Sequence, residues 1–341
     1  MRLHPHVCGA KGCRGETGWV RNVPMNLKSP SVALRRFAWL PLVAGIATTQ
    51  SAFALIFISS GEVGFNTTAP TGPLEGSGWQ YQGSWQGLLG TAIAPNSFIT
   101  AKHIGGGVGG TFSYQGSSYT TSARFDHPTA DLTVWQVSGT FSSYAPLYTG
   151  TAEIGQDVVL FGRSAVRGAE VNVPGASPTP LRGWQSGSAG GGMTRWGENQ
   201  VDDVFVLDGA EYLLAGFSSN GGPNEAMLAS GDSGGGMFIL DGGVWKLAGI
   251  NSKVQSTFSM GASGPTFQAA IFDAGGLFTS TTGGLLQLPD GAQDWEAIFL
   301  STRISAYSEW ITAVPEPEAV AVWAGVALTT FAGWRRWRRD V

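Results

Sequence analysis

Cysteine is almost absent from this 341-residue chain, and its two copies, Cys8 and Cys13, both stand near the start. No later residue carries a thiol, which excludes a disulfide framework, a thiolate-bound metal and a cysteine nucleophile for the rest of the chain. Histidine is scarce as well, because only His103 and His127 lie beyond residue 50. The fold must therefore depend on core packing, and any histidine chemistry depends on one of two side chains.

Charged residues are also few, at 13% of the chain against 43% hydrophobic residues. Residues 55–314 hold nine Lys and Arg against 20 Asp and Glu, whereas both ends of the chain are basic. An acidic body lacks the basic surface that nucleic-acid binding needs, so we expect no nucleic-acid partner. The sequence has no His/Cys cluster for a metal and no phosphate-binding loop, and we expect neither a metal nor another cofactor.

The basic first segment is typical of a targeting sequence. Its stretch LRRFAWLPLVAGIATTQSAFA begins with arginines, continues with a short apolar run and closes on the small-x-small pattern Ala52-Phe53-Ala54. This order predicts a secretory signal peptide over residues 1–54, cut after Ala54, with a membrane anchor as the alternative. Met25 begins a more ordinary signal sequence than Met1 does, and we favour it as the initiator.

The last segment, residues 315–341, combines Pro-Glu-Pro at 315–317, an uncharged span over 319–334 and four arginines after it. This order resembles the PEP-CTERM sorting signal of Gram-negative bacteria. The resemblance implies a transmembrane sorting helix, transient anchoring in the inner membrane and removal of the tail by an exosortase-type enzyme. The alternative is a plain C-terminal anchor whose basic end stays inside the cell.

Between these ends the sequence has the pattern of a β protein. Turn residues separate short runs rich in β-branched and aromatic residues, among them GLLGTAIA, SFITA, LTVWQV, DVVLFG, DVFVLD, GMFIL and WKLAGI. This pattern predicts an all-β sandwich or barrel over residues 55–314. We expect the glycine-rich segments 104–122 and 185–192 to be mobile loops, and a helix only near 301–314.

The stretch ASGDSGGGMF, which contains Ser233, is a candidate nucleophile loop. A serine hydroxyl becomes a nucleophile when a base takes its proton, and that base needs an orienting carboxylate. His103 ends the apolar segment GTAIAPNSFITAKH, and Asp131 stands directly before the predicted strand LTVWQV. These positions favour His103 over His127 as the base, and Asp131 over Asp126 as the carboxylate.

Five segments resemble the trypsin-like (chymotrypsin-fold) serine proteases, in the order that the family has them. GTAIAPNSFITAKH resembles the segment that ends on the catalytic histidine, HPTADLTVWQV the segment with the triad aspartate, and SGDSGGGMF the nucleophile loop. GINS at 249–252 resembles the substrate-lining strand, and STRISAYSEWI the closing strand and C-terminal helix. The resemblance covers most of residues 86–312 and implies two antiparallel six-stranded β-barrels with a short C-terminal helix.

The resemblance also implies a role for each matched position. Ser233 would be the nucleophile, His103 the general base and Asp131 the carboxylate that orients the imidazole. The backbone N–H groups of Gly231 and Ser233 would form the oxyanion hole. Met227 would correspond to a position at the base of the substrate pocket.

The sequence departs from the family in ways that affect specificity and activation. Met227 stands where many members have an acid, so we expect an apolar or small substrate side chain there. Ser252 would lie on the strand that lines the substrate, and an insertion over residues 253–295 follows it. Many members begin with Ile/Val-Gly-Gly, and the amine of that start pairs with the aspartate before the serine. This chain lacks such a start, so the sequence does not identify a partner for Asp232.

These observations predict an exported serine endopeptidase that acts through a Ser-His-Asp triad and an acyl-enzyme. Two alternatives remain: a non-catalytic cell-surface or matrix protein on a protease-like scaffold, and an esterase that uses the same triad. The expected partners are a protein or peptide substrate, signal peptidase and an exosortase-type enzyme. The expected location is the periplasm or cell surface of a Gram-negative bacterium.

Overall fold

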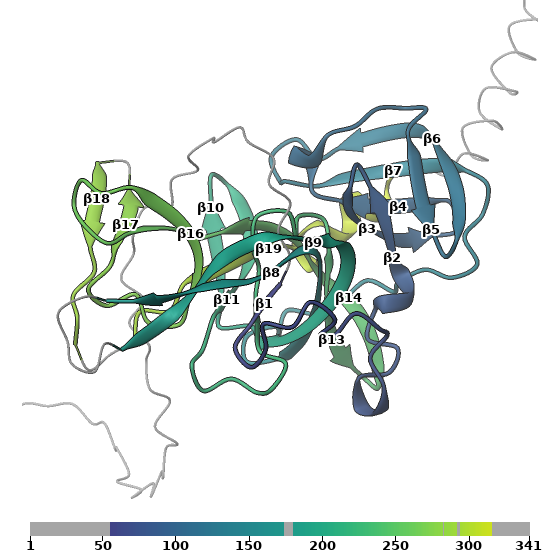
Figure 1. Cartoon of the computed structure of the whole chain (residues 1–341). Coiled ribbons are helices and arrows are strands. Elements are labelled where there is room, and N and C mark those ends of the chain that lie inside the picture. Colours follow the sequence, from purple (N-terminus) through teal and green to yellow (C-terminus); the bar gives the residue numbers. More distant parts are fainter. Residues whose placement is uncertain (1–54, 174–179, 282, 292–293, 316–341) are drawn as a thin grey trace, which may run out of the picture. The chain divides into compact units, whose positions relative to one another are not determined.

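The computed structural model describes residues 55–173, 180–281, 283–291 and 294–315 (Figure 1). The expected signal peptide lies outside these residues, as does the expected sorting signal apart from its first proline. Strands dominate the described chain, and the prediction of an all-β fold is confirmed. None of the helices in this part of the chain has the length and apolar character that a membrane crossing requires.

The first half of the body closes into a six-stranded antiparallel barrel (Figure 1, blue), in the order β2-β3-β4-β7-β6-β5. Its strands are β2 (Gln82–Trp85), β3 (Leu88–Ala94), β4 (Ser97–Thr100), β5 (Thr111–Tyr114), β6 (Ser117–Asp126) and β7 (Thr133–Ser138). The short 3-10 helices η1 (Gly72–Leu74) and η2 (Trp79–Tyr81) precede it, and η3 (Lys102–Ile104) follows β4. The first of the two expected barrels is therefore present.

Aromatic rings fill the interior of this barrel. Phe98 stacks on Phe112 with 3.9 Å between the ring centroids, and Trp85 lies 4.7 Å from Trp135. All four side chains are fully buried, and burying rings of this size contributes roughly 1.5–3 kcal/mol each. The indole N–H of Trp85 donates to the carbonyl of Gly105 at 3.0 Å. The core thus holds the loop that leaves η3 and fixes where His103 stands.

The second half of the body does not close into the expected second six-stranded barrel. It forms one 11-stranded sheet in the order β10-β11-β19-β14-β13-β8-β9-β16-β15-β17-β18. Its strands are β8 (Asp157–Asn172), β9 (Leu181–Gln200), β10 (Asp203–Leu207), β11 (Ala210–Gly216), β13 (Gly236–Asp241), β14 (Val244–Val254), β15 (Thr257–Ser259), β16 (Thr266–Ile271), β17 (Phe278–Thr281), β18 (Gly284–Gln287) and β19 (Ile298–Arg303). The expectation was wrong because β9 pairs with β8 and β16, and β11 pairs with β10 and β19, so that neither closes on the other. A separate two-stranded sheet joins β1 (Ile56–Phe57) and β12 (Ala226–Met227).

The predicted insertion over 253–295 supplies the far end of this sheet. Figure 1 shows β16, β17 and β18 beyond the long β8–β9 hairpin, and the sheet order there is β9-β16-β15-β17-β18. The buried guanidinium of Arg182 on β9 forms ion pairs with Asp273 and with Asp290, the latter at 2.8 Å. A charge that is buried needs such paired carboxylates, so these contacts fasten the insertion to the hairpin.

Both segments expected to be mobile loops contain strands. Segment 104–122 includes β5 and the start of β6, joined by a tight turn at Gln115-Gly116 whose two residues have φ of 48° and 77°. Two successive positive φ angles are typical of a two-residue hairpin turn. Segment 185–192 lies inside β9, which pairs with β8 on one side. Glycine content predicted loops here, and strand pairing overrode it.

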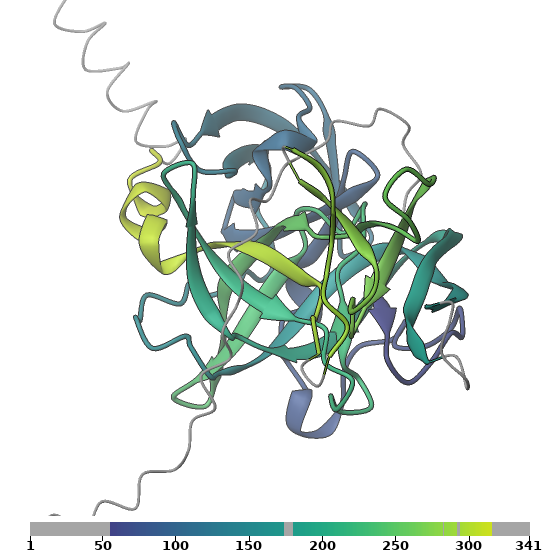
Figure 2. The ribbon, with the colours of Figure 1, turned by 90° about the vertical axis from the view of Figure 1, so that its left-hand side faces the viewer.

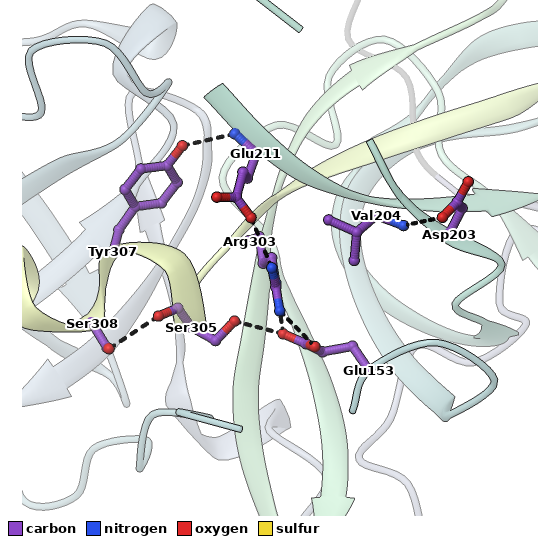
Figure 3. A network of polar contacts seen from close by, with 8 residues as sticks. All are labelled: Glu153, Asp203, Val204, Glu211, Arg303, Ser305, Tyr307 and Ser308. Atoms are coloured by element: carbon purple, nitrogen blue, oxygen red, sulfur yellow. Dashed lines mark hydrogen bonds and ion pairs between the residues drawn. The ribbon is translucent and has the colours of Figure 1, made fainter. Parts of the chain in front are cut away.

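An ion-pair network fixes the end of β19 (Figure 3). Arg303 donates to both carboxylate oxygens of Glu153, at 2.8 and 2.9 Å, and to Glu211 at 2.7 Å. The hydroxyl of Ser305 also donates to Glu153, at 2.5 Å. Burial raises the pKa of Glu153, but these hydrogen bonds outweigh it and keep the pKa below its usual range.

The C-terminal helical segment follows directly and lies against the first barrel, as Figure 2 shows (yellow beside blue). It consists of η4 (Ser305–Tyr307) and α1 (Ser308–Thr312), as the sequence predicted. The rings of Tyr307 and Trp310 lie 4.6 and 4.9 Å from the ring of His127. The segment therefore supports the loop between β6 and β7, from which Asp131 projects.

The side chain of Glu225, just before β12, is expected to make stability depend on pH. Burial, together with the charges of Glu296, Asp202 and Glu198, raises its pKa to about 8, against an ordinary value of 4.5. The folded chain then holds a proton that the unfolded chain releases, so stability falls as pH rises from about 4.5 to about 8. We expect Glu225→Gln to remove this fall and to be more stable than the wild type at pH 8, by up to about 4 kcal/mol.

Urea unfolding of both chains at pH 5 and pH 8 would measure this effect. Glutamine keeps an oxygen for the N–H groups of Ser218 and Asn199, which lie 3.0 and 3.3 Å from the Glu225 carboxylate. The two chains should differ little at pH 5. If the free energy of unfolding of the two chains changed equally between pH 5 and pH 8, the pKa of Glu225 would not be raised in the folded protein.

Candidate active site

Ser233 stands in a tight turn between β12 and β13. The N–H groups of Asp232 and Gly235 donate to the carbonyls of Ala229 and Asp232, at 3.1 and 3.3 Å. Gly234, the residue after the serine, has a φ of 79°, a backbone conformation that favours glycine. The glycines after the serine are therefore required by the turn and do not form a flexible spacer.

Asn251, which the sequence analysis did not single out, ties this turn to β14. Its backbone exchanges hydrogen bonds with Gly234 and Gly235, both at 2.9 Å. Its buried side-chain amide donates to the carbonyls of Phe161 and Asp232, at 2.7 and 3.2 Å. The signal in the sequence was an amide directly after the apolar run WKLAGI, because a buried amide there needs several partners.

A chain of short hydrogen bonds joins Asp131, His103 and Ser233. His103 Nε2 lies 2.8 Å from Ser233 Oγ, and His103 Nδ1 lies 2.7 Å from Asp131 Oδ2. The backbone N–H of His103 also donates to Asp131 Oδ1 at 2.9 Å. The closed barrel supplies the histidine and the aspartate, and the 11-stranded sheet flanks the serine. The structure thus brings together the three residues that the sequence analysis selected.

Asp131 is held as a carboxylate. Burial opposes its ionisation, but hydrogen bonds from His103 and from Ser252, whose hydroxyl donates at 2.5 Å, lower its pKa to about 2. The aspartate side chain is 12% exposed, whereas His103 is 46% exposed. A fixed negative charge behind an accessible imidazole favours the tautomer with its proton on Nδ1, which leaves Nε2 free to accept a proton.

The competing residues have other partners. Asp126, at the end of β6, accepts hydrogen bonds from Arg124 at 2.8 Å and from Thr133 at 2.6 Å. The Nδ1 atom of His127 accepts from the backbone N–H of Ala130 at 2.8 Å. Both side chains therefore fix the turn between β6 and β7 and do not contact His103.

A cavity of about 190 Å³ opens beside the serine. Residues 228–233 form one wall, residues 251–254 form the other, and His103 stands at its edge. Ser252 thus lines the cavity, as the sequence analysis expected. Met227 does not, because its buried side chain belongs to β12, where it faces Ile56 of β1. Met227, which was expected at the base of the pocket, belongs instead to the two-stranded sheet of β1 and β12.

Two backbone N–H groups beside the serine lack an acceptor. In the described chain, the N–H groups of Gly231 and Ser233 donate to no residue, unlike those of Asp232, Gly234 and Gly235 around them. Gly231 has a φ of 101°, a conformation that side chains disfavour. Unpaired donors next to a nucleophile are the arrangement that stabilises a developing oxyanion.

Asp232, whose partner the sequence left open, is almost completely buried. Its carboxylate accepts the backbone N–H groups of Arg163 and Ala229, at 2.9 and 2.8 Å. Burial raises its pKa well above the usual range, and these two hydrogen bonds and the Arg195 charge oppose that rise only in part. Within the residues that the structure describes, Asp232 forms no ion pair, and no cluster of His, Cys, Asp and Glu side chains can hold a metal.

Gly234→Ala is expected to destabilise the protein strongly. An added Cβ would collide with the carbonyl of Leu89 and the hydroxyl of Thr100, and lie 2.7 Å from Ile104. Overpacking and a strained φ together should cost roughly 2–4 kcal/mol. Gly116→Ala is the matched control, since its φ of 77° is nearly the same but nothing lies within 4 Å of the new Cβ. Thermal unfolding would compare them, and equal losses would contradict the collision.

Comparison with models of known protein families gave no match, and comparison with curated proteins gave none. Among solved structures, the chain is similar to neuropsin, a serine protease expressed in the limbic system of mouse brain. The identity is 16%, the match covers 70% of this chain and 95% of that one, and the TM-score is 0.42.

Proposed function

We propose that this protein is a serine endopeptidase with Ser233 as the nucleophile, His103 as the general base and Asp131 as the orienting carboxylate. The observation that supports this most directly is the Asp131–His103–Ser233 hydrogen-bond chain, with contacts of 2.7 and 2.8 Å. Serine attack on a carbonyl needs such a base within hydrogen-bond reach. The unpaired N–H groups of Gly231 and Ser233 supply the oxyanion donors in this proposal.

The reaction would proceed through an acyl-enzyme. Ser233 Oγ attacks the scissile carbonyl while His103 Nε2 takes the hydroxyl proton, and the carbonyl oxygen becomes an oxyanion. His103 then gives the proton to the leaving amine as the peptide bond breaks. Water, deprotonated by His103, attacks the ester and releases the acid together with free serine. Asp131 stays ionised throughout and stabilises the imidazolium.

The proposal includes export. A signal peptide over residues 1–54 would direct the chain out of the cytoplasm through signal peptidase. A PEP-CTERM signal over residues 315–341 would anchor it transiently until an exosortase-type enzyme removes the tail. Residues 55–314 would then act on protein or peptide substrates in the periplasm or at the cell surface of a Gram-negative bacterium.

Labelling with a fluorophosphonate probe would test this function, because the probe reacts with serines that a base has activated. The wild-type chain is compared with Ser233→Ala and with Ser230→Ala, a neighbouring serine that is exposed and lines the same cavity. We expect labelling of the wild type and of Ser230→Ala only. Labelling that survives in Ser233→Ala would contradict the assignment of the nucleophile. Turnover of matched peptide and ester substrates would then separate a peptidase from an esterase.

A further inference from the structure

Lys253 lines the cavity that contains His103 and Ser233. It lies near the end of β14, where pairing with β19 shifts register between Asn251 and Lys253. Such β-bulges redirect side chains and are frequent beside active sites. Here the bulged residue, Ser252, donates to Asp131, and the next residue, Lys253, lines the cavity.

The Lys253 ammonium differs from the other cations of the body. Residues 55–314 hold nine Lys and Arg, and eight of them have a carboxylate or a hydrogen-bond acceptor in the described chain. Among the described residues Lys253 has neither, and its Nζ lies 5.8 Å from the ring centroid of Tyr212. A ring positions a cation without neutralising it, so the full charge remains for an incoming anion.

No other accessible charge competes with Lys253 in the cavity. Asp131 lies behind His103 and is engaged by His103 and Ser252. Asp232 is 1% exposed and accepts two backbone N–H groups. The remaining lining residues, apart from His103, are neutral.

The edge of β14 beside Lys253 is open to a peptide. β13 pairs with β14 only from Val244 to Ile250, and Lys253 and Val254 pair with β19 on the other side alone. An extended peptide can add to such an edge through backbone hydrogen bonds. Since side chains repeat every ~3.3 Å along a strand, Lys253 would meet a side chain within a few residues of the bond at Ser233.

We propose that Lys253 selects substrates with an Asp or Glu side chain close to the scissile bond, a preference that rests on the proposed peptidase function. The carboxylate would form a charge-assisted hydrogen bond with the Lys253 ammonium, and such bonds are about twice as strong as neutral ones. The acidic body repels acidic peptides at longer range, so the preference comes from this local contact. The substrate side chain that Lys253 would bind is a different one from the side chain that Met227 was expected to contact.

Pairs of eight-residue peptides that differ only in Glu or Gln test this selection, with the pair placed in turn at each position around the cleaved bond. We expect one position at which Glu raises kcat/KM about 10- to 100-fold over Gln. Lys253→Gln should bring that ratio close to one, and Lys253→Glu should reverse it in favour of a Lys peptide. Lys246→Gln is the matched control, since this lysine of β14 pairs with Asp241 at 2.7 Å and lies outside the cavity lining.

Binding to the Ser233→Ala chain separates this proposal from the catalytic one. Fluorescence polarisation of the same peptide pairs reports the charge preference without turnover. Preferential binding of Glu peptides that vanishes in Ser233→Ala/Lys253→Gln supports the role of Lys253 even if the wild type cleaves nothing. Equal binding of Glu and Gln peptides at every position, or a preference that survives in the double variant, would overturn it.

Discussion

Replacing Ser233 with alanine is expected to lower peptide turnover by roughly 10⁵- to 10⁶-fold, and His103→Ala should cost nearly as much. In the proposed mechanism the hydroxyl forms the acyl bond, and His103 Nε2, 2.8 Å from it, takes its proton. Neither group retains its function without the other, because an unassisted hydroxyl is a poor nucleophile and a base without a nucleophile has no covalent step to serve.

The double variant makes this prediction sharper. If the two residues act as one unit, Ser233→Ala/His103→Ala should be no slower than either single variant. Two independent contributions would instead multiply. Steady-state kcat/KM for a cleaved peptide measures all three chains, and thermal unfolding checks that each is folded. A Ser233→Ala chain that keeps more than about 1% of wild-type activity would contradict the mechanism.

The site could be anticipated from the sequence because its residues stand at the ends of strongly patterned strands. His103 follows β4 and Asp131 precedes β7, and both strands are almost wholly buried, with Phe98, Ile99 and Trp135 among their residues. The pairing of β4 with β7 then brings the two positions together. Asn251 and Lys253 were missed because their importance depends on β14 lying beside the Ser233 turn, which is a long-range arrangement.

The second half of the fold was predicted less well, for physical reasons. The glycines of 185–192 looked like a loop, yet Gly187 lies opposite Gly168 of β8. A Cβ at Gly168 would lie 2.8 Å from the Gln185 carbonyl, so glycine here permits the two strands to approach closely. Local composition cannot separate this use of glycine from a flexible turn, because the partner strand decides it.

Replacing Asp131 with asparagine is expected to lower kcat by roughly 10³- to 10⁴-fold with little loss of stability. The carboxylate accepts the Nδ1 proton of His103 at 2.7 Å, which leaves Nε2 free to take a proton from Ser233. An asparagine amide in the same place can donate to Nδ1, and the imidazole proton then moves to Nε2. In that tautomer Nε2 faces the serine as a donor and cannot act as the base.

Two matched variants isolate this cause. Asp126→Asn changes the competing carboxylate, whose partners are Arg124 and Thr133, and should leave kcat within about threefold of the wild type. Ser252→Ala removes one donor to Asp131 and should cost about tenfold at most, because His103 still orders the carboxylate. Since the Asp131 pKa is about 2, the wild type should lose no activity through this group above pH 4. An Asp131→Asn chain within tenfold of the wild type would mean that another group orients His103.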